Sequence, residues 1–260
     1  MKVELTVLGG AAAWPNAGQG CSSYLLRSRD TQLLLDCGPD TLLELRKHTR
    51  LAGIDAIIVS HCHADHILDL VTLRYALVYS RDRAEERLPL WLPPGGARIL
   101  EALGQALGSQ GETSDDFWGE VFALREYDAA RSLKVNDLSI DFSRTQHFTA
   151  CFAVRVRTAD GRTIVYGADT GNIAPLLEFA AGASLLISEA TADSHAGVPP
   201  ESRGHLTPED AGGWAGASGA RRLLISHLWQ ERAPSEVVRR AAQHFDGPID
   251  IATPGLTLYV

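Results

Sequence analysis

The sequence predicts an α/β (α+β) fold in which two β-sheets pack against each other and helices cover their outer faces. Strands and helices recur in two similar halves, with strands first in each half and helices interleaved after them. Several strands pair as hairpins, because Asn136-Asp137 and Asp160-Gly161 are turn sequences between short apolar runs. Two packed sheets satisfy this pattern better than one parallel sheet.

In the first half, short apolar runs bounded by Gly, Pro and Asp indicate strands, and apolar residues at helical spacing indicate helices. Pro39 fits the first turn of a helix. The sequence Pro-Pro-Gly-Gly at residues 93–96 ends the strand before it. The expected strands are residues 3–7, 23–27, 32–35, 55–60 and 88–91, and the expected helices are residues 39–47, 67–77 and 97–107.

In the second half, Thr207-Pro208-Glu209-Asp210 is a capping box with proline at the first helical position. The polar, glycine-bearing residues 108–118 are expected to be a surface connection, with a mobile loop beside a functional site as the alternative. The expected strands are residues 133–135, 138–140, 151–158, 163–166, 184–189 and 223–226 with two more at the end, and the expected helices are residues 174–181, 208–219 and 234–245.

The bulk properties are those of an ordinary globular protein. We expect residues 1–260 to form one domain, since no stretch has the composition of a linker. The net charge of −8 argues against general nucleic-acid binding. The four cysteines form no C-x-x-C pair, the first residues do not resemble a signal peptide, and no apolar run is long enough to span a membrane. We therefore expect a cytoplasmic protein with no membrane partner.

The densest chemical signal is the run His61-Cys62-His63-Ala64-Asp65-His66, directly after the buried strand at residues 55–60. Alternate side chains of an extended segment face the same way, so the side chains of His61 and His63 can point toward the same place. Asp65 and His66 follow where the chain turns into a helix, and their side chains can point toward a second place nearby. The alternative, a polar turn that happens to be rich in histidine, gives these side chains no reason to converge.

This run resembles the signature His-x-His-x-Asp-His of the metallo-β-lactamase superfamily and matches it at every specified position. The resemblance implies a four-layer αββα sandwich with two divalent metal ions. It implies that one ion is held by His61, His63 and His147, the other by Asp65, His66 and His227, with Asp169 bridging both. Zinc suits this donor set, and manganese or iron would also fit.

Three of the implied ligands lie outside the signature, each at or just after the end of an expected strand. Taken alone, His147 or His227 would more often be a core or edge histidine, and Asp169 a turn acid. Their order and the Gly-Ala-Asp-Thr context of Asp169 favour ligation. Asp36, in an Asp-x-Gly strand end, is either a loop acid or an acceptor that orients a ligand histidine. His48, His195 and His244 lack such contexts and are expected at the surface.

Within the superfamily, Glu189-Ala190-Thr191 and Gly204-His205-Leu206-Thr207 resemble the ribonuclease Z branch. This likeness implies that His205 contacts the substrate phosphate or protonates the leaving oxygen, and that Glu189 orients it. Either residue alone could be a surface group. Only 21 residues, 148–168, separate His147 from Asp169, which leaves no room for the long arm with which ribonuclease Z grips transfer RNA. The residues after His227, Leu228-Trp229-Gln230, also differ from the Ser-x-Arg/Tyr sequence that is usual in that branch. The short ribonuclease Z-like hydrolases are therefore the closer likeness.

The function implied is hydrolysis of a phosphodiester, such as a small diester, a cyclic nucleotide or a short RNA. A hydroxide bridging the metals would be the nucleophile, and Asp65, His205 and Glu189 would be the catalytic residues. Two alternatives stay open: a carboxylic ester or lactone hydrolase on the same metals, and a metal-binding protein that has lost activity. A homodimer is common among similar proteins and is a further expectation.

Overall fold

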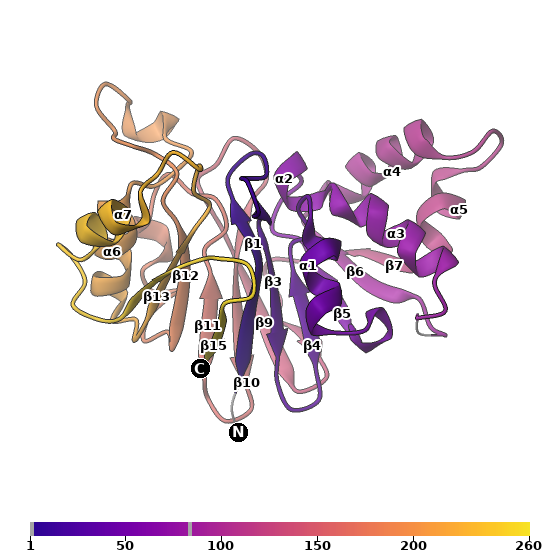
Figure 1. Ribbon diagram of the computed structural model, residues 1–260, viewed down its shortest axis with the longest axis horizontal. Helices are drawn as coiled ribbons and strands as arrows, with labels where there is room; N and C mark the ends of the chain where they lie inside the picture. Colours follow the sequence, from indigo (N-terminus) through magenta and orange to yellow (C-terminus); the bar gives the residue numbers. More distant parts are fainter. Residues whose placement is uncertain (1–2, 83–84) are drawn as a thin grey trace.

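Two β-sheets pack face to face, and helices lie on the outer face of each (Figure 1). The computed structural model describes residues 3–82 and 85–260; residues 1–2 and 83–84 lie outside the described part. The predicted arrangement of two packed sheets with helices outside is confirmed. In the described part of the chain, no helix combines the length and the apolar character needed to cross a membrane.

The first sheet has eight strands in the described residues, in the order β15-β1-β3-β4-β5-β6-β7, with β2 paired to β1. Strands β1, β3 and β4 are antiparallel, β4 to β7 run parallel to one another, and β15 at the end of the chain pairs antiparallel with β1. The strands are β1 Glu4–Ala11, β2 Gly20–Cys21, β3 Ser23–Arg27, β4 Gln32–Leu35, β5 Ala56–Ile58, β6 Leu88–Leu92, β7 Phe122–Glu126 and β15 Thr257–Tyr259.

The second sheet repeats this plan with seven strands in the described residues, in the order β14-β13-β12-β11-β10-β9-β8. Strands β8 to β11 are antiparallel hairpins, at the two turns that the sequence predicts, and β11 to β14 are parallel. The strands are β8 Leu133–Val135, β9 Leu138–Arg144, β10 Phe152–Thr158, β11 Thr163–Tyr166, β12 Leu185–Glu189, β13 Leu223–Ser226 and β14 Ile249–Ile251.

The helices cover the two outer faces. Helices α1 and α3 to α5 lie against the first sheet, α6 and α7 lie against the second, and the short α2 lies at the upper edge in Figure 1. The helices are α1 Thr41–His48, α2 Ala64–Ile67, α3 Asp69–Tyr79, α4 Gly96–Leu107, α5 Ser114–Gly119, α6 Pro208–Ser218 and α7 Pro234–Ala241, with 3-10 turns η1 Leu51–Gly53, η2 Ala174–Leu176 and η3 Pro200–Ser202.

The side-chain alternation of the strands builds three apolar layers. In β3, Tyr24 and Leu26 point into the cluster between the sheets, while Leu25 points outward into the cluster beneath α1 and α3 to α5. In β11, Ile164 points between the sheets and Val165 points toward the layer that contains Trp214 of α6. Strands β4, β5, β12 and β13 are buried on both faces and are apolar at most positions, whereas β9 alternates between buried and partly exposed residues.

Two expected elements differ in kind from the structure, and α1 begins at Thr41, so Pro39 precedes the N-cap Asp40 instead of lying in the first helical turn. Residues 174–181 form only the 3-10 turn η2 followed by turns, because Pro175 and Gly182 leave too short a segment for a stable helix. Residues 108–118 are not a plain surface connection, since α5 begins after the N-cap Thr113, in a capping box with Asp116. Trp118 at its end is buried and donates a hydrogen bond of 2.6 Å to the carbonyl of Leu100, which fixes the segment against α4.

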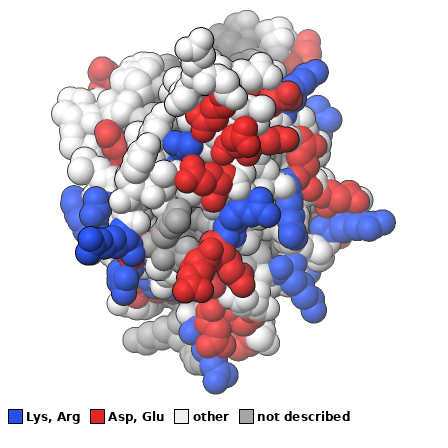
Figure 2. Space-filling view, turned by 90° about the vertical axis from the view of Figure 1, so that its right-hand side faces the viewer, with Lys and Arg blue, Asp and Glu red and all other residues white. Residues whose placement is uncertain are grey.

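Figure 2 shows the face at the right of Figure 1, around α3, α4 and α5. Acidic side chains gather along the middle of this face, and Lys and Arg side chains lie on either side of them. This face therefore offers no broad basic surface to a phosphate backbone, in keeping with the net charge of −8.

Candidate metal centre

The loop after β5 and the short helix α2 carry the histidine-rich run. The loop is held by Asp36, whose Oδ1 accepts a hydrogen bond of 2.6 Å from the backbone N–H of Ser60. His63 is the N-cap of α2, and the N–H of His66 donates to the carbonyl of His63 at 3.0 Å. Asp65 and His66 thus lie in the first helical turn, and the ring of His66 lies beside that of His61, with 4.0 Å between the ring centroids.

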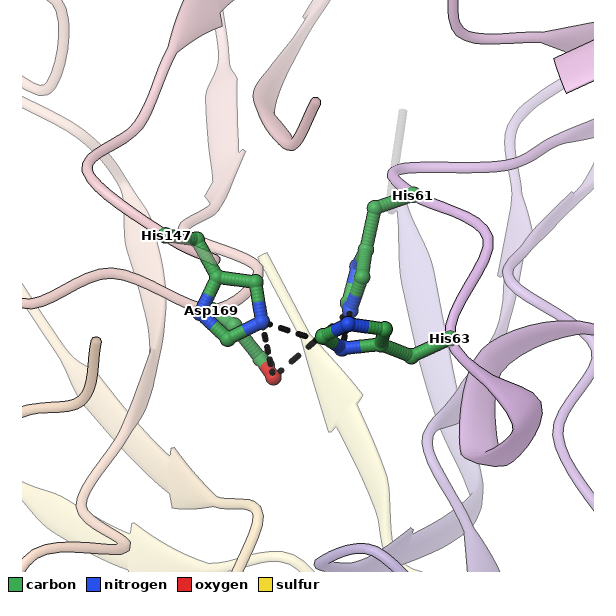
Figure 3. A group of neighbouring side chains, drawn as sticks. All are labelled: His61, His63, His147 and Asp169. Carbon is green, nitrogen blue, oxygen red and sulfur yellow. Dashed lines mark hydrogen bonds and ion pairs between the residues drawn. The ribbon is translucent and has the colours of Figure 1, made fainter. Parts of the chain in front are cut away.

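Three further side chains reach the same place from the second sheet. His147 follows β9, Asp169 follows β11 and His227 follows β13, as the strand-end pattern predicts. Figure 3 shows His147 and Asp169 facing His61 and His63 from the opposite side. His227 and Ala168, the residue before Asp169, have φ of 55° and 49°. Positive φ is uncommon for residues other than glycine and is often found at functional sites.

The first donor group consists of His61, His63, His147 and Asp169. The Nδ1 atom of His63 lies 3.2 Å from Nε2 of His61 and 3.1 Å from Nε2 of His147. The Oδ2 atom of Asp169 lies 3.7 Å from Nε2 of His61 and 3.6 Å from Nε2 of His147. Two ligands of a tetrahedral ion with bonds of about 2.1 Å are roughly 3.4 Å apart, so these spacings suit one ion.

The second donor group consists of Asp65, His66 and His227. The Oδ2 atom of Asp65 lies 3.0 Å from Nε2 of His227 and 3.5 Å from Nε2 of His66. Asp169 also borders this group, because its Oδ1 lies 3.6 Å from Nε2 of His66 and its Oδ2 lies 3.5 Å from Nε2 of His227. Asp169 therefore lies between the two groups, as a bridging carboxylate would.

The far ring nitrogens of four of these histidines already have partners. The Nδ1 contacts are His61 to Ser60 Oγ at 3.1 Å, His66 to Asp36 Oδ2 at 2.7 Å, His147 to the Gly204 carbonyl at 2.8 Å, and His227 to Thr191 Oγ1 at 2.6 Å. A histidine that donates from Nδ1 presents the lone pair of Nε2 to the centre, which is the usual arrangement of a metal ligand.

The buried Nε2 atom of His66 gives an independent test of the fit. It has no hydrogen-bond partner, although carboxylate oxygens of Asp65 and Asp169 lie on either side of it. A buried polar atom without a partner is costly. A divalent cation among these nitrogen and oxygen donors would satisfy the atom and balance the carboxylates, so the donor set fits such an ion.

The three histidines of the first group favour the neutral form. Burial lowers the pKa of His61, His63 and His147, because an imidazolium loses its hydration inside the protein. Neutral imidazole is the form that binds a metal ion. These side chains therefore need little deprotonation before they act as ligands.

In the second group, and in the Asp169 carboxylate beside it, the pKa values depend strongly on neighbouring charged side chains. Burial disfavours the charged form of His66, but the carboxylates of Asp169 and Asp36 prevail and raise the pKa of His66 to about 9. Burial would likewise raise the pKa of Asp169, but the neighbouring His227 and His66 hold it well below its usual range. A divalent cation would compete with the proton of His66, so metal affinity should fall as the pH falls.

Asp36 acts as an acceptor behind the centre rather than as a loop acid. Besides Ser60 N–H, its carboxylate accepts from Ser60 Oγ at 2.7 Å, from the Tyr166 hydroxyl at 2.6 Å and from His66 Nδ1 at 2.7 Å. Tyr166 and Thr191 were not singled out from the sequence, although Thr191 belongs to the Glu-Ala-Thr segment. Only the spatial meeting of β4, β11 and the loop after β5 reveals their role.

Replacing Asp36 with asparagine should weaken metal binding by roughly 10- to 100-fold. Every partner of the Asp36 carboxylate is a donor, so an amide NH2 would face another donor and leave His66 poorly oriented. Competition titration with a chromogenic chelator measures the affinity. Asp55→Asn is the matched control, since Asp55 also accepts two hydrogen bonds, from Gln32 N–H and Asn136 Nδ2. Equal metal affinity in both variants would contradict the prediction.

His205 and Glu189 form a pair beside the donor groups. The Nδ1 atom of His205 lies 3.0 and 3.1 Å from the two carboxylate oxygens of buried Glu189, and 4.0 Å from Asp169 Oδ2. Glu189 is itself fixed by the N–H groups of Thr170 at 2.8 Å and Thr191 at 3.3 Å. Burial opposes protonation, but Glu189 outweighs it and raises the pKa of His205 to about 9.

The structure thus brings together all nine residues expected in the site. His205 is near enough to form a further donor group with Asp169 and His227. The other histidines do not join these groups. His48 and His195 pair with Glu44 and Asp210 at 2.9 and 2.7 Å, and His244 is exposed.

Residues 31–228 of this chain match the protein family described as Beta-lactamase superfamily domain, and they include all seven candidate ligands. The chain belongs to the β-lactamase superfamily. The superfamily protein YhfI of Bacillus subtilis, described as a probable metallo-hydrolase, is 29% identical over 255 residues, covering 97% of this chain and 98% of YhfI. Its crystal structure superposes with a TM-score of 0.87 and 28% identity, covering 100% of both chains.

This chain is also similar to two proteins with other names. Ribonuclease Z of Haloferax volcanii is 25% identical over 311 residues, covering 100% of this chain and 96% of the ribonuclease. The crystal structure of a diphosphatase from the PhnP family has a TM-score of 0.77 at 21% identity, covering 100% of this chain and 98% of the diphosphatase. This second likeness shows the shared fold, and it agrees with the predicted four-layer αββα sandwich.

Proposed function

We propose that this chain is a metal-dependent phosphodiesterase that acts on small diesters, cyclic nucleotides or short RNA. As a member of the β-lactamase superfamily with metallo-hydrolase relatives, it is a hydrolytic enzyme. A ribonuclease and a diphosphatase are both named for reactions at phosphate esters or anhydrides, and the likeness to these two proteins supports phosphorus as the centre attacked.

Two divalent ions would occupy the two donor groups, with His61, His63 and His147 on one ion, Asp65, His66 and His227 on the other, and Asp169 shared. We propose zinc, because imidazole and carboxylate donors at these spacings suit a tetrahedral ion. Metal analysis that finds manganese or iron instead would overturn that choice. When bound, such ions lower the pKa of water toward about 7 and offset charge on the phosphate oxygens.

The observation that carries the proposal is the His205–Glu189 pair. With Nδ1 donating to Glu189, the protonated ring of His205 has its Nε2–H free to donate to a departing oxygen. The Thr170 and Thr191 N–H groups hold the Glu189 carboxylate still, so the ring keeps its orientation. A poor alkoxide leaving group needs such a proton, whereas an activated lactam does not.

The substrate we propose is small. The 21 residues between His147 and Asp169 form β10, β11 and their connections, with no added arm for gripping a folded RNA. The acidic net charge and the mixed face of Figure 2 do not favour a long phosphate backbone. Homodimer formation and a cytoplasmic location remain predictions of the sequence.

A substrate comparison tests the proposal directly. Metal-loaded protein should hydrolyse a chromogenic phosphodiester, and we expect little turnover with a panel of lactones and carboxylic esters. The ratio of kcat/KM values for the two classes is the measurement. Turnover of lactones without turnover of any phosphodiester would overturn the proposal. Protein that holds two metals yet hydrolyses neither class would indicate a binding protein instead.

The variant Glu189→Gln tests the protonated state of His205. Glu189 raises the pKa of His205, so the imidazolium persists to higher pH and activity is lost only as the pH rises through that pKa. Without the carboxylate charge, the alkaline limb of the kcat profile should move to lower pH. Identical alkaline limbs in the variant and the parent would show that His205 is not the group that titrates.

A further inference from the structure

Two tryptophans lie exposed and stacked where the loop after β1 meets the segment after β13. The ring centroids of Trp14 and Trp229 are 6.0 Å apart, and the ring planes differ by 14°. Their side chains are 52% and 38% exposed. Large aromatic rings that remain in water as a neighbouring pair commonly mark a binding surface.

Both tryptophans are close in the chain to candidate metal ligands. Trp14 follows Ala13, whose backbone N–H donates a hydrogen bond of 2.8 Å to Oδ2 of Asp65. Trp229 lies two residues after His227. Ala13 and His227 both have positive φ, 58° and 55°, and the N–H of Trp14 bonds back to the carbonyl of Ala12 at 2.6 Å. These uncommon conformations turn both segments sharply beside the donor groups.

The two segments are also bonded to each other. Leu228 donates to the carbonyl of Gly10 at 3.1 Å, and its own carbonyl accepts from Ala12 N–H at 3.3 Å and from Asn16 Nδ2 at 3.0 Å. The side chain of Gln230 accepts from Ala17 N–H at 2.9 Å. The two segments that carry the tryptophans are therefore bonded to each other, and the first of them is bonded to Asp65 through Ala13, which places the pair at a set position beside the donor groups.

We propose that Trp14 and Trp229 stack the base of a nucleotide phosphodiester while its phosphate lies at the donor groups. The inference rests on the proposed function and narrows its substrate class to diesters that carry a nucleobase. Stacking on an aromatic side chain accepts any base, because every base has a flat π face. A contact between protein copies would not need the segment that carries Trp14 to be bonded to Asp65 of the donor groups.

Matched substrates test the role of the pair. The methyl phosphodiester of adenosine 5′-phosphate is compared with the same diester of ribose 5-phosphate, which lacks only the base. Trp14→Ala and Trp229→Ala should each lower kcat/KM for the adenosine diester by roughly 5- to 150-fold. They should leave the ribose diester within about twofold, with metal content unchanged.

The chain offers a matched control in Tyr79. Its ring stacks on Tyr75 of α3 at a centroid distance of 6.3 Å and an angle of 5°, and it is 78% exposed. Tyr79→Ala should leave the turnover of both diesters unchanged. Equal losses for both diesters in the tryptophan variants would overturn the inference. So would a change of oligomeric state in sedimentation with the preference for the base intact.

A binding measurement separates this inference from the proposed function. Calorimetric titration of the metal-loaded protein with adenosine 5′-monophosphate and with ribose 5-phosphate needs no turnover. Suppose that neither diester is hydrolysed, but the nucleotide binds more tightly than the sugar phosphate, and does so only while both tryptophans are present. Base stacking on the tryptophan pair is then supported, and the proposed reaction is contradicted. If the two ligands bind the parent protein equally, base stacking on the tryptophan pair is contradicted, whether or not the diesters are hydrolysed.

Discussion

Replacing Asp169 with alanine should remove at least one metal ion and reduce hydrolysis below detection. Its two carboxylate oxygens lie 3.5 to 3.7 Å from Nε2 atoms of His61, His66, His147 and His227. No other carboxylate borders both donor groups among the described residues. Without it, five imidazoles converge and Asp65 is the one carboxylate left in these two donor groups. The loss should exceed the 10- to 100-fold change typical of a residue that only orients a ligand.

Metal content measured by mass spectrometry of the purified protein decides this prediction. Asp246→Ala is the control, because Asp246 is exposed and its removal changes the net charge equally. The melting temperature of both variants shows whether the fold persists. Two ions per chain and undiminished turnover in Asp169→Ala would mean that the donor groups do not hold the catalytic metals.

His205→Ala should lower kcat for an alkyl phosphodiester by roughly two to four powers of ten while both ions stay bound. The reason is the loss of the proton donor that Glu189 orients and keeps charged. A diester with an acidic phenol as leaving group needs no such proton, so its turnover should fall far less. The dependence of kcat on the leaving group therefore separates proton donation from a structural role.

The matched control for this variant is His244→Ala, which removes an exposed imidazole beyond the end of α7. Its rates should equal those of the parent for both diesters. Equal rate losses for alkyl and phenol leaving groups in His205→Ala would contradict the general-acid role. Loss of metal in that variant would instead place His205 among the ligands, with Asp169 and His227.

The sequence predicts which residues meet at the candidate metal centre, because these residues follow strand ends. The run from His61 to His66 is local, so its spacing alone indicates two clustered points. His147, Asp169 and His227 each follow a strand of the second sheet, and the edge of a sheet gathers such residues whatever the details of packing. Positions set by strand alternation and register are therefore readable from one sequence.

Contacts that depend on how the two sheets meet cannot be predicted from the sequence. The hydroxyl of Tyr166 reaches Asp36 across 130 positions of the sequence, and Thr191 reaches His227 across 36. Neither spacing follows a periodic rule. The helix expected at residues 174–181 failed for a related reason, since a short apolar segment takes its final form from tertiary packing rather than from local preference.

The donor groups draw on both halves of the chain: residues 61–66 come from the first sheet, and His147, Asp169 and His227 come from the second. Bound ions would therefore form a non-covalent cross-link between the two sheets. A cation that binds only the closed sandwich adds about 2.7 kcal/mol to its free energy of unfolding at a hundred times the Kd. Chelation would then do more than stop catalysis, because it would release the edge at which the two sheets are joined.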